Sequence, residues 1–176
     1  MEKDIFMKDD QVSDENPGAI FIFCLLYALH MVEEFTLGFV EWGDRYFGSF
    51  DWTQNIIGNS IFFVCLAFAC CLYYKNPGKY LWVGMCASMW VLANAFIHLS
   101  ATLLSGEYSP GVVTATVLYI PGGLYFLVKW GRKGLLTWKN LTLSFIVGAL
   151  IFMLIPTFAR AVFLHAKLAK LFCLFN

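Results

Sequence analysis

Apolar residues run through the chain in long stretches that short polar segments separate. Between Thr53 and Gly106 the only charged residues are Lys75 and Lys79. A transmembrane helix needs ~20 mainly apolar residues, and five stretches reach about that length. Strands of a membrane barrel would alternate apolar and polar residues, and these stretches do not. A helix in lipid forms all of its backbone hydrogen bonds within itself. We therefore predict an all-α fold, a polytopic membrane helical bundle of about five transmembrane helices: Gly18–Val40, Gln54–Tyr74, Lys79–Leu104, Gly111–Lys129 and Asn140–Ala159.

The two ends of the chain differ from this apolar region. Half of the twelve acidic residues lie within the first fifteen positions, and a secretion signal would begin with basic residues instead. We predict that residues 1–17 form an acidic cytoplasmic leader and that residues 18–159 form the bundle. Residues 160–176 carry Arg160, Lys167 and Lys170 among Leu, Phe and Ala. This pattern predicts a basic amphipathic tail at the membrane interface.

Composition narrows the class of protein. The 176 residues are 60% apolar and 14% charged, with a mean hydropathy of +0.68, whereas soluble proteins are about 25% charged. A disordered chain is therefore excluded, and a soluble globule is nearly excluded as well. The net charge is zero, so the basic surface that nucleic-acid binding needs is missing. The predicted partner is the lipid bilayer.

The distribution of Lys and Arg in the short loops predicts the orientation. Cytoplasmic loops carry an excess of Lys and Arg. The loops after the second and fourth predicted helices hold six such residues, and the loops after the first and third hold only Arg45. The N-terminus is therefore predicted to be cytoplasmic. Five helices then place the basic tail on the opposite side, against the same rule, so either the tail is basic on the outer face or the last helix is re-entrant.

Two predicted helices carry ionisable side chains, which in a membrane usually face the bundle interior and mark function. His30, Glu33 and Glu34 follow the spacing i, i+3, i+4 and share one helix face. Asn94 and His98 are four residues apart and share a face of the third predicted helix. We expect the two groups to face each other.

Depth in the bilayer supports this pairing. The first and third helices run in the same direction, and at 1.5 Å per residue their polar groups lie about 18–24 Å and 22–28 Å from the inner end. Asn59 and Thr114 lie near the outer starts of the second and fourth helices. In a hydrocarbon core ~30 Å thick, all of these side chains fall in the outer half. We predict a site that opens toward the non-cytoplasmic side, with Asn59 and Thr114 as supporting residues.

The adjacent carboxylates are the strongest sign of function. Two ionised groups side by side in a low dielectric cost several kcal/mol unless a proton or a cation is shared. A purely structural role would not need both Glu33 and Glu34.

The motifs resemble a known family. His30-Met-Val-Glu-Glu34 is an HxxEE string in the first apolar helix, and Asn94-Ala-Phe-Ile-His98 is an NxxxH string further on. Together they resemble the HXXEE family of small multi-pass membrane proteins, over roughly Pro17 to Ala159. The resemblance implies the site and the topology but no particular reaction.

The first hypothesis for the chemistry is a metal centre. Its predicted ligands are His30, Glu33, Glu34 and His98, a mixed nitrogen and oxygen set that suits Zn, Fe or Mn. Asn94 would support the ligands. A bound metal could activate water, giving a membrane-embedded hydrolase or similar enzyme for a hydrophobic substrate such as a lipid or an isoprenoid.

Two other functions stay open. A metal-free enzyme would use Glu33, Glu34, His98 and Asn94 as catalytic groups, with one carboxyl protonated and the other acting as a base, in the manner of an intramembrane protease or an isomerase. A non-enzymatic binding protein, or a carrier of protons or metal ions, would need the same intramembrane groups.

Overall fold

The computed structural model describes residues 16–48, 51–148 and 150, and these residues form helices and turns without any strand. Four helical segments are long and apolar enough to cross a membrane. The first joins the 3₁₀ turn η2 (Pro17–Phe21) to α1 (Ile22–Thr36), the second is α3 (Trp52–Lys75) and the third is α4 (Leu81–Ser105). The fourth joins α5 (Val112–Thr114), η3 (Ala115–Tyr119) and α6 (Ile120–Arg132). The predicted all-α membrane fold is confirmed.

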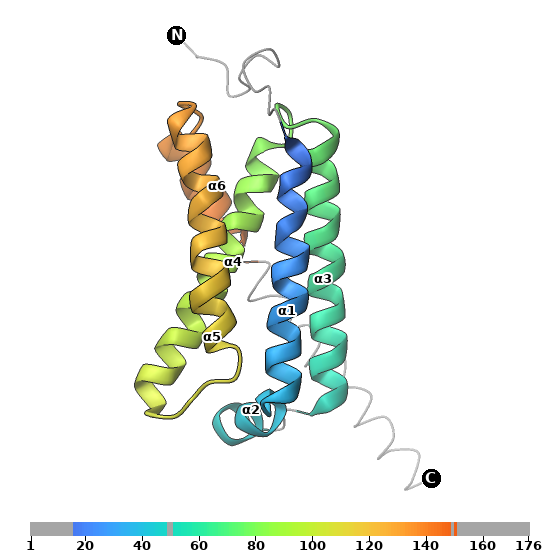
Figure 1. The fold of residues 1–176 in the computed structure, drawn as a ribbon, viewed down its shortest axis with the longest axis vertical. Helices are drawn as coiled ribbons and strands as arrows, with labels where there is room; N and C mark the ends of the chain where they lie inside the picture. The colour runs from blue at the N-terminus through green and yellow to red at the C-terminus, as the bar shows by residue number, and fades with distance from the viewer. Residues whose placement is uncertain (1–15, 49–50, 149, 151–176) are drawn as a thin grey trace, which may run out of the picture.

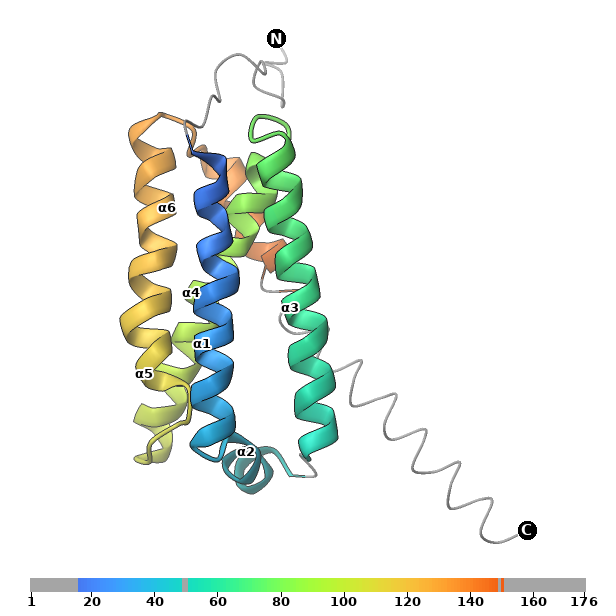
Figure 2. The ribbon, with the colours of Figure 1, turned by 45° about the vertical axis from the view of Figure 1, so that its right-hand side comes forward.

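Successive spans alternate in direction, so α1 and α4 run the same way (Figure 1). Figure 2 shows α1 lying between α6 and α3, with α4 behind it. The end of α1 therefore lies at the same end of the bundle as the end of α4 and the start of α5. The first and third spans therefore run in the same direction, as predicted, and their polar groups lie near the same end of the bundle.

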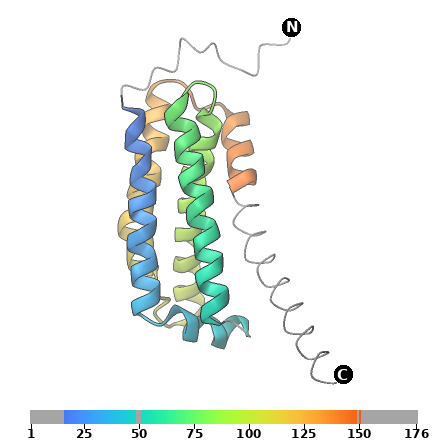
Figure 3. The same cartoon turned by 90° about the vertical axis from the view of Figure 1, so that its right-hand side faces the viewer.

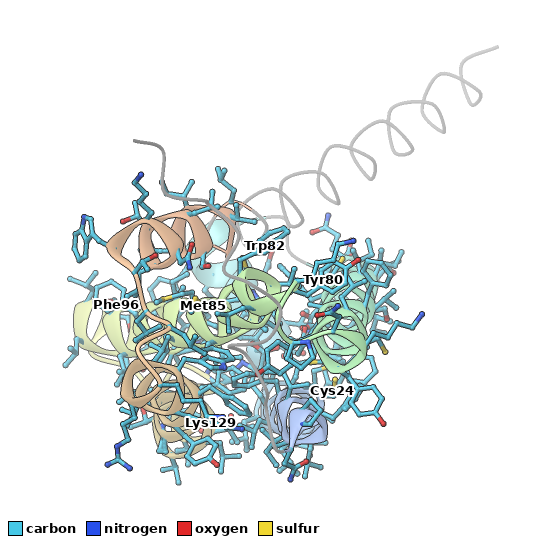
Figure 4. All side chains as sticks on the ribbon, turned by 90° about the horizontal axis from the view of Figure 1, so that it is seen from above. Cys24, Tyr80, Trp82, Met85, Phe96 and Lys129 are labelled. Carbon is cyan, nitrogen blue, oxygen red and sulfur yellow. The ribbon has the colours of Figure 1, made fainter. Side chains whose placement is uncertain are left out.

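The distribution of apolar side chains is compatible with embedding of the bundle in a lipid bilayer. Phe23, Phe126 and Trp130 are almost completely buried between helices. By contrast, Val64 and Phe96 are 65% and 72% exposed, and Phe96 lies on the outer side of the bundle (Figure 4). Soluble proteins rarely expose apolar surface on every side, so these outward side chains are the ones that a bilayer would cover.

The first span ends earlier than predicted. Helix α1 stops at Thr36, Leu37 has non-helical dihedrals, and Gly38 adopts a left-handed φ of 80°. The chain then forms α2 (Phe39–Phe47), which lies across the end of the bundle (Figure 1). The predicted boundary at Val40 was therefore wrong, because the apolar run continues across the left-handed break into an interfacial helix.

The fourth span contains an irregular turn. The chain enters it at Gly111 with a φ of 100°, and after a single α-helical turn residues Ala115–Tyr119 form a π-helical turn. Such turns are rare and often occur at functional sites.

The fifth predicted span is described only in part. Residues 138–148 are helical and form the orange segment at the edge of the bundle (Figure 3). Ser144 Oγ donates to the Trp82 carbonyl oxygen at 3.2 Å, and a Cβ on Gly148 would lie 3.0 Å from the Cys86 carbonyl oxygen. Small residues four apart permit this close helix packing. The remainder of that span, residues 1–15 of the leader and the tail lie outside the described residues.

Candidate functional site

Three side chains converge near the ends of α1 and α4. His30 and Glu34 lie one turn apart on α1, and His98 lies on α4. Glu34 Oε1 is 3.4 Å from His30 Nε2 and 3.4 Å from His98 Nε2. The imidazole rings meet edge to face with their centroids 4.8 Å apart. The three residues are 1–4% exposed, so the structure brings the two predicted motifs together in a buried cluster.

Hydroxyl groups hold the outer nitrogens of both imidazoles. His30 Nδ1 is 2.8 Å from Thr114 Oγ1, and His98 Nδ1 is 3.2 Å from Ser109 Oγ. The Thr114 hydroxyl also lies 3.2 Å from the Gly111 carbonyl oxygen, to which it can donate; His30 Nδ1 donates to Thr114 Oγ1 in the tautomer that carries its proton on Nδ1. Each imidazole is thereby oriented with Nε2 toward Glu34.

That tautomer of His30 would create an electrostatic conflict at Glu34. A neutral His30 with its proton on Nδ1 presents the Nε2 lone pair to a carboxylate oxygen 3.4 Å away. Within the described residues, His30 Nε2 has no hydrogen-bond partner. Two lone pairs would repel at this distance, and a proton or a cation between them would remove the repulsion.

Gly111 allows the two imidazoles to approach each other. A Cβ at this position would lie 2.7 Å from Cε1 of both His30 and His98, and the φ of 100° disfavours any other residue. The loop before α5 therefore packs its backbone directly against the cluster.

Glu33 has a different environment from its neighbour. Its Oε1 accepts from the backbone N–H groups of Gly111 at 3.0 Å and Val113 at 3.1 Å, and its Oε2 accepts from Thr114 N–H at 2.7 Å. The first N–H groups of a helix have no partner within the helix and carry a partial positive charge. Glu33 therefore caps the N-terminus of the fourth span, whereas the adjacent Glu34 contacts the two imidazoles.

Tyr108, in the loop between the third and fourth spans, donates its hydroxyl proton to Glu33 Oε1. Partial burial, together with this hydrogen bond to a carboxylate, raises the pKa of Tyr108 to about 12. The phenol therefore stays protonated and remains a donor at physiological pH.

The structure places the remaining predicted residues at different distances from the cluster. Thr114 belongs to it, through His30 and through its own N–H. Asn94 is 8% exposed, one turn before His98, and its Oδ1 lacks a hydrogen-bond partner among the described residues. Asn59 lies on α3, where it accepts from Tyr27 OH of α1 at 2.5 Å and donates to Asn55 Oδ1 at 2.7 Å. Asn59 thus takes part in a separate hydrogen-bonded group.

Several contacting residues could not be identified from the pattern of polar positions. Ser109 and Gly111 lie in a short loop that no periodicity describes, and the Tyr119 ring packs 4.7 Å from the His30 ring. Phe39 of α2 packs 5.8 Å from the His98 ring. The short loop was the one sequence feature that could have indicated them. Only six residues separate the third span from the fourth, so the fourth span must begin close to the end of the third, near His98.

The donor set matches known kinds of metal centre. The ligand atoms of His30, Glu34 and His98 all lie within 4.8 Å of one another. Two histidines with one carboxylate form catalytic zinc sites and non-haem iron sites. Metal-binding histidines usually hold their second nitrogen in a hydrogen bond, as both imidazoles do here.

Comparison with known proteins identifies relatives of the chain. The family model described as "Protein of unknown function with HXXEE motif" matches residues 21–126. "Uncharacterized protein YrkK" of Bacillus subtilis (strain 168) is 28% identical over 148 residues, covering 78% of this chain and 90% of the relative. No solved structure matches the chain. The family match spans more than half of the chain and includes both motifs, so the chain belongs to the HXXEE family.

Proposed function

We propose that this protein is a membrane-embedded, metal-dependent enzyme in which His30, Glu34 and His98 hold one divalent transition metal ion, Zn, Fe or Mn. The observation that carries the proposal is the convergence of both Nε2 atoms on Glu34 Oε1 while hydroxyl groups hold both Nδ1 atoms. Glu33 is left out of the ligand set, because backbone N–H groups and Tyr108 already occupy its oxygens.

Charge compensation favours a cation at the cluster. The segments Pro17–Thr36 and Leu81–Ser105, which hold the three residues, contain no Lys or Arg. An ionised carboxylate buried without a counter-charge is costly. A divalent ion would neutralise Glu34 and accept the Nε2 lone pairs at the same time.

The chemistry follows from the number of ligands. Three protein ligands leave a coordination position open, as in catalytic rather than structural zinc sites. A bound metal would supply Lewis acidity and an activated water, and this chain would orient the ligands and exclude bulk water. A substrate that reaches a cluster buried between lipid-facing helices must itself be hydrophobic. We therefore propose hydrolysis, or a related reaction, of a lipid-like substrate.

Elemental analysis tests the metal directly. Protein purified in mild detergent without added metal should contain about one transition metal ion per chain, and Glu34→Gln and His98→Ala should lose it while remaining helical by circular dichroism. Glu107→Gln, a matched change at an exposed carboxylate, should keep it. Folded wild-type protein that binds no Zn, Fe(II) or Mn even after loading would overturn the proposal.

A metal-free acid–base enzyme is the second candidate. One observation favours it: Glu34 Oε1 is equally distant from the two Nε2 atoms, so a single proton could be shared within the triad. Infrared spectroscopy distinguishes the two candidates. A protonated-carboxyl band that disappears in Glu34→Gln, in protein without metal, would favour the proton.

A further inference from the structure

The two ends of the described bundle carry opposite charges. The acidic residues of the described part of the chain all lie at the end that holds the His/Glu cluster: Glu33, Glu34, Glu41, Asp44, Asp51 and Glu107. The opposite end, where α1 and α4 begin and α3 and α6 end, has only basic residues among its described charges (Figures 1 and 4). We call this set the basic end: Lys75, Lys79, Lys129, Arg132, Lys133 and Lys139.

Most of the basic end is accessible and has no acidic neighbour in the described residues. Lys75, Lys79, Arg132 and Lys139 are exposed, and none of these four side chains forms an ion pair with another described residue. Helix dipoles do not supply the negative charge. Two helices, α3 and α6, end here, but α1, α4 and the 138–148 helix begin here and bring partial positive charge. An acidic partner would therefore have to come from outside the described residues.

The chain itself supplies an acidic segment. Residues 9–15 contain four acidic residues, Asp9, Asp10, Asp14 and Glu15, and no Lys or Arg. Their net charge of −4 matches in size the four exposed basic residues without an acidic neighbour. Opposite charges of this size on two surfaces favour association and suppress other partners.

The described residues show where this acidic segment joins the bundle. The segment is continuous with Pro17, which begins η2. A Cβ on Gly18 would lie 3.8 Å from the Tyr74 ring, and the Phe21 and Tyr74 ring centroids are 5.8 Å apart. Tyr74 directly precedes Lys75, so the acidic segment is attached beside the basic end of α3.

This attachment favours contact over separation. Seven residues of flexible chain span roughly 15 Å, and short tethers of this kind give effective concentrations in the millimolar range. Charges attract within a Debye length of about 8 Å at physiological salt. Acidic lipid head groups are the alternative occupants, since they attract basic residues at a membrane surface. The leader is favoured because it is held in place whatever the lipid composition, and because acidic lipids would repel its carboxylates everywhere except over the basic end.

We propose that residues 9–15 dock on the basic end of the same chain and shield it from acidic lipid head groups. The leader would thus be a tethered competitor that determines how strongly this end of the bundle binds an anionic membrane surface. The proposal goes beyond the metal site, which lies at the opposite end of the bundle, and does not depend on it.

Photocrosslinking tests the contact in the full-length protein. The crosslinking residue p-benzoylphenylalanine replaces Val12, and the protein is held in phosphatidylcholine nanodiscs. We expect adducts within residues 75–80 and 131–139. Adding Asp9→Asn, Asp10→Asn and Asp14→Asn keeps the crosslinker but removes three charges, and should lower the adduct yield about fivefold, the scale of a few exposed ion pairs. Salt at 1 M, where the Debye length is about 3 Å, should have a similar effect. Glu107→Gln, at the acidic end, should leave the yield unchanged.

Native mass spectrometry tests the competition with lipid. Wild-type protein and the triple Asp→Asn variant, both without the crosslinker, are released from mixed micelles that contain phosphatidylglycerol, and the bound lipids are counted. We expect the triple variant to bind more phosphatidylglycerol than the wild type, because its basic end is no longer shielded. Glu107→Gln should bind as the wild type does.

Several results would overturn the inference. Adducts with lipid alone, or none within the basic end, would show that the leader does not dock there. A yield that neither the triple variant nor 1 M salt lowers would show that tethering without charge attraction accounts for the adducts. Adducts that join two chains would assign the surface to a second copy. Equal phosphatidylglycerol binding by the wild type and the triple variant would show that lipid, and not the leader, occupies the basic end.

Discussion

The division of labour between the two adjacent glutamates can be tested with a pair of matched variants. In Glu33→Gln, one of the two carboxylate oxygens becomes an NH₂ group that cannot accept a hydrogen bond. If that group takes the place of Oε2, the Thr114 N–H, which donates to Oε2 at 2.7 Å, loses its partner. Placing it at Oε1 instead would leave the N–H groups of Gly111 and Val113 without one. At least one buried donor is unsatisfied in either orientation.

The size of the effect follows from these contacts. An unsatisfied buried donor costs about 1–3 kcal/mol, and the loss of a negative charge at a partly buried helix N-terminus costs up to ~2 kcal/mol. We expect Glu33→Gln to lower the free energy of unfolding by about 3 kcal/mol, which is about a hundredfold in the unfolding equilibrium. The contacts of the Glu34 carboxylate within the described residues are with the two imidazoles and not with a helix N-terminus, so Glu34→Gln should have a much smaller effect on metal-free protein.

Equilibrium unfolding in mixed dodecyl sulfate and maltoside micelles, followed by circular dichroism, measures both values. Metal content is measured on the same samples and should be lost in Glu34→Gln but retained in folded Glu33→Gln. An unchanged unfolding free energy in Glu33→Gln would refute the capping argument. If that variant were also to lose its metal, Glu33 would return to the ligand set.

Four further predictions concern the surroundings of the site. Gly111→Ala should separate the imidazoles, because its Cβ would lie 2.7 Å from both rings, and should abolish metal retention, whereas Gly106→Ala, with a similar left-handed φ but nothing within 4 Å, should retain it. Thr114→Val should weaken metal affinity about 10–100-fold by releasing His30 Nδ1, as measured by competition with a chelator. The pKa of Tyr108 is about 12 in the folded protein and about 10 in the unfolded chain. The stabilisation by its protonated hydroxyl is therefore complete below pH ~10 and is lost as the pH rises toward about 12. In alkaline unfolding, Tyr108→Phe should not show this loss of stability. A membrane-impermeant thiol reagent should not label Arg132→Cys from outside intact cells, and labelling there would reverse the predicted orientation.

Much of the site could be predicted because helical spacing determines which side chains share a face. His30 and Glu34 are four residues apart, as are Asn94 and His98, and the alternation of spans makes α1 and α4 parallel. The depths of the two groups in the bilayer therefore follow from the sequence alone. The apolar lengths alone were sufficient to predict the four spans that the structure describes.

The rest depends on the backbone between the spans. The roles of Glu33 and Glu34 differ only because the N–H groups of Gly111, Val113 and Thr114 face α1, and no side-chain pattern shows where a helix begins relative to its neighbour. The end of α1 was misplaced for a similar reason, since Leu37 continues the apolar run while Gly38 takes a left-handed conformation.

The π-helical turn at Ala115–Tyr119 has a consequence for how this site could change. In an α-helix, residues five apart point in directions roughly 140° apart, whereas the wider hydrogen-bonding pattern of a π turn brings residues five apart onto one side. Thr114 and Tyr119 are five apart, and both contact His30. A π turn holds one residue more than the α-helical turn it replaces, so deleting one residue, such as Leu118, would leave a regular α-helical span in which Thr114 and Tyr119 are four apart and still share a face. The loss of a single codon would therefore remove the π turn while keeping the group that orients the imidazole and the group that packs against it on the same side of the span.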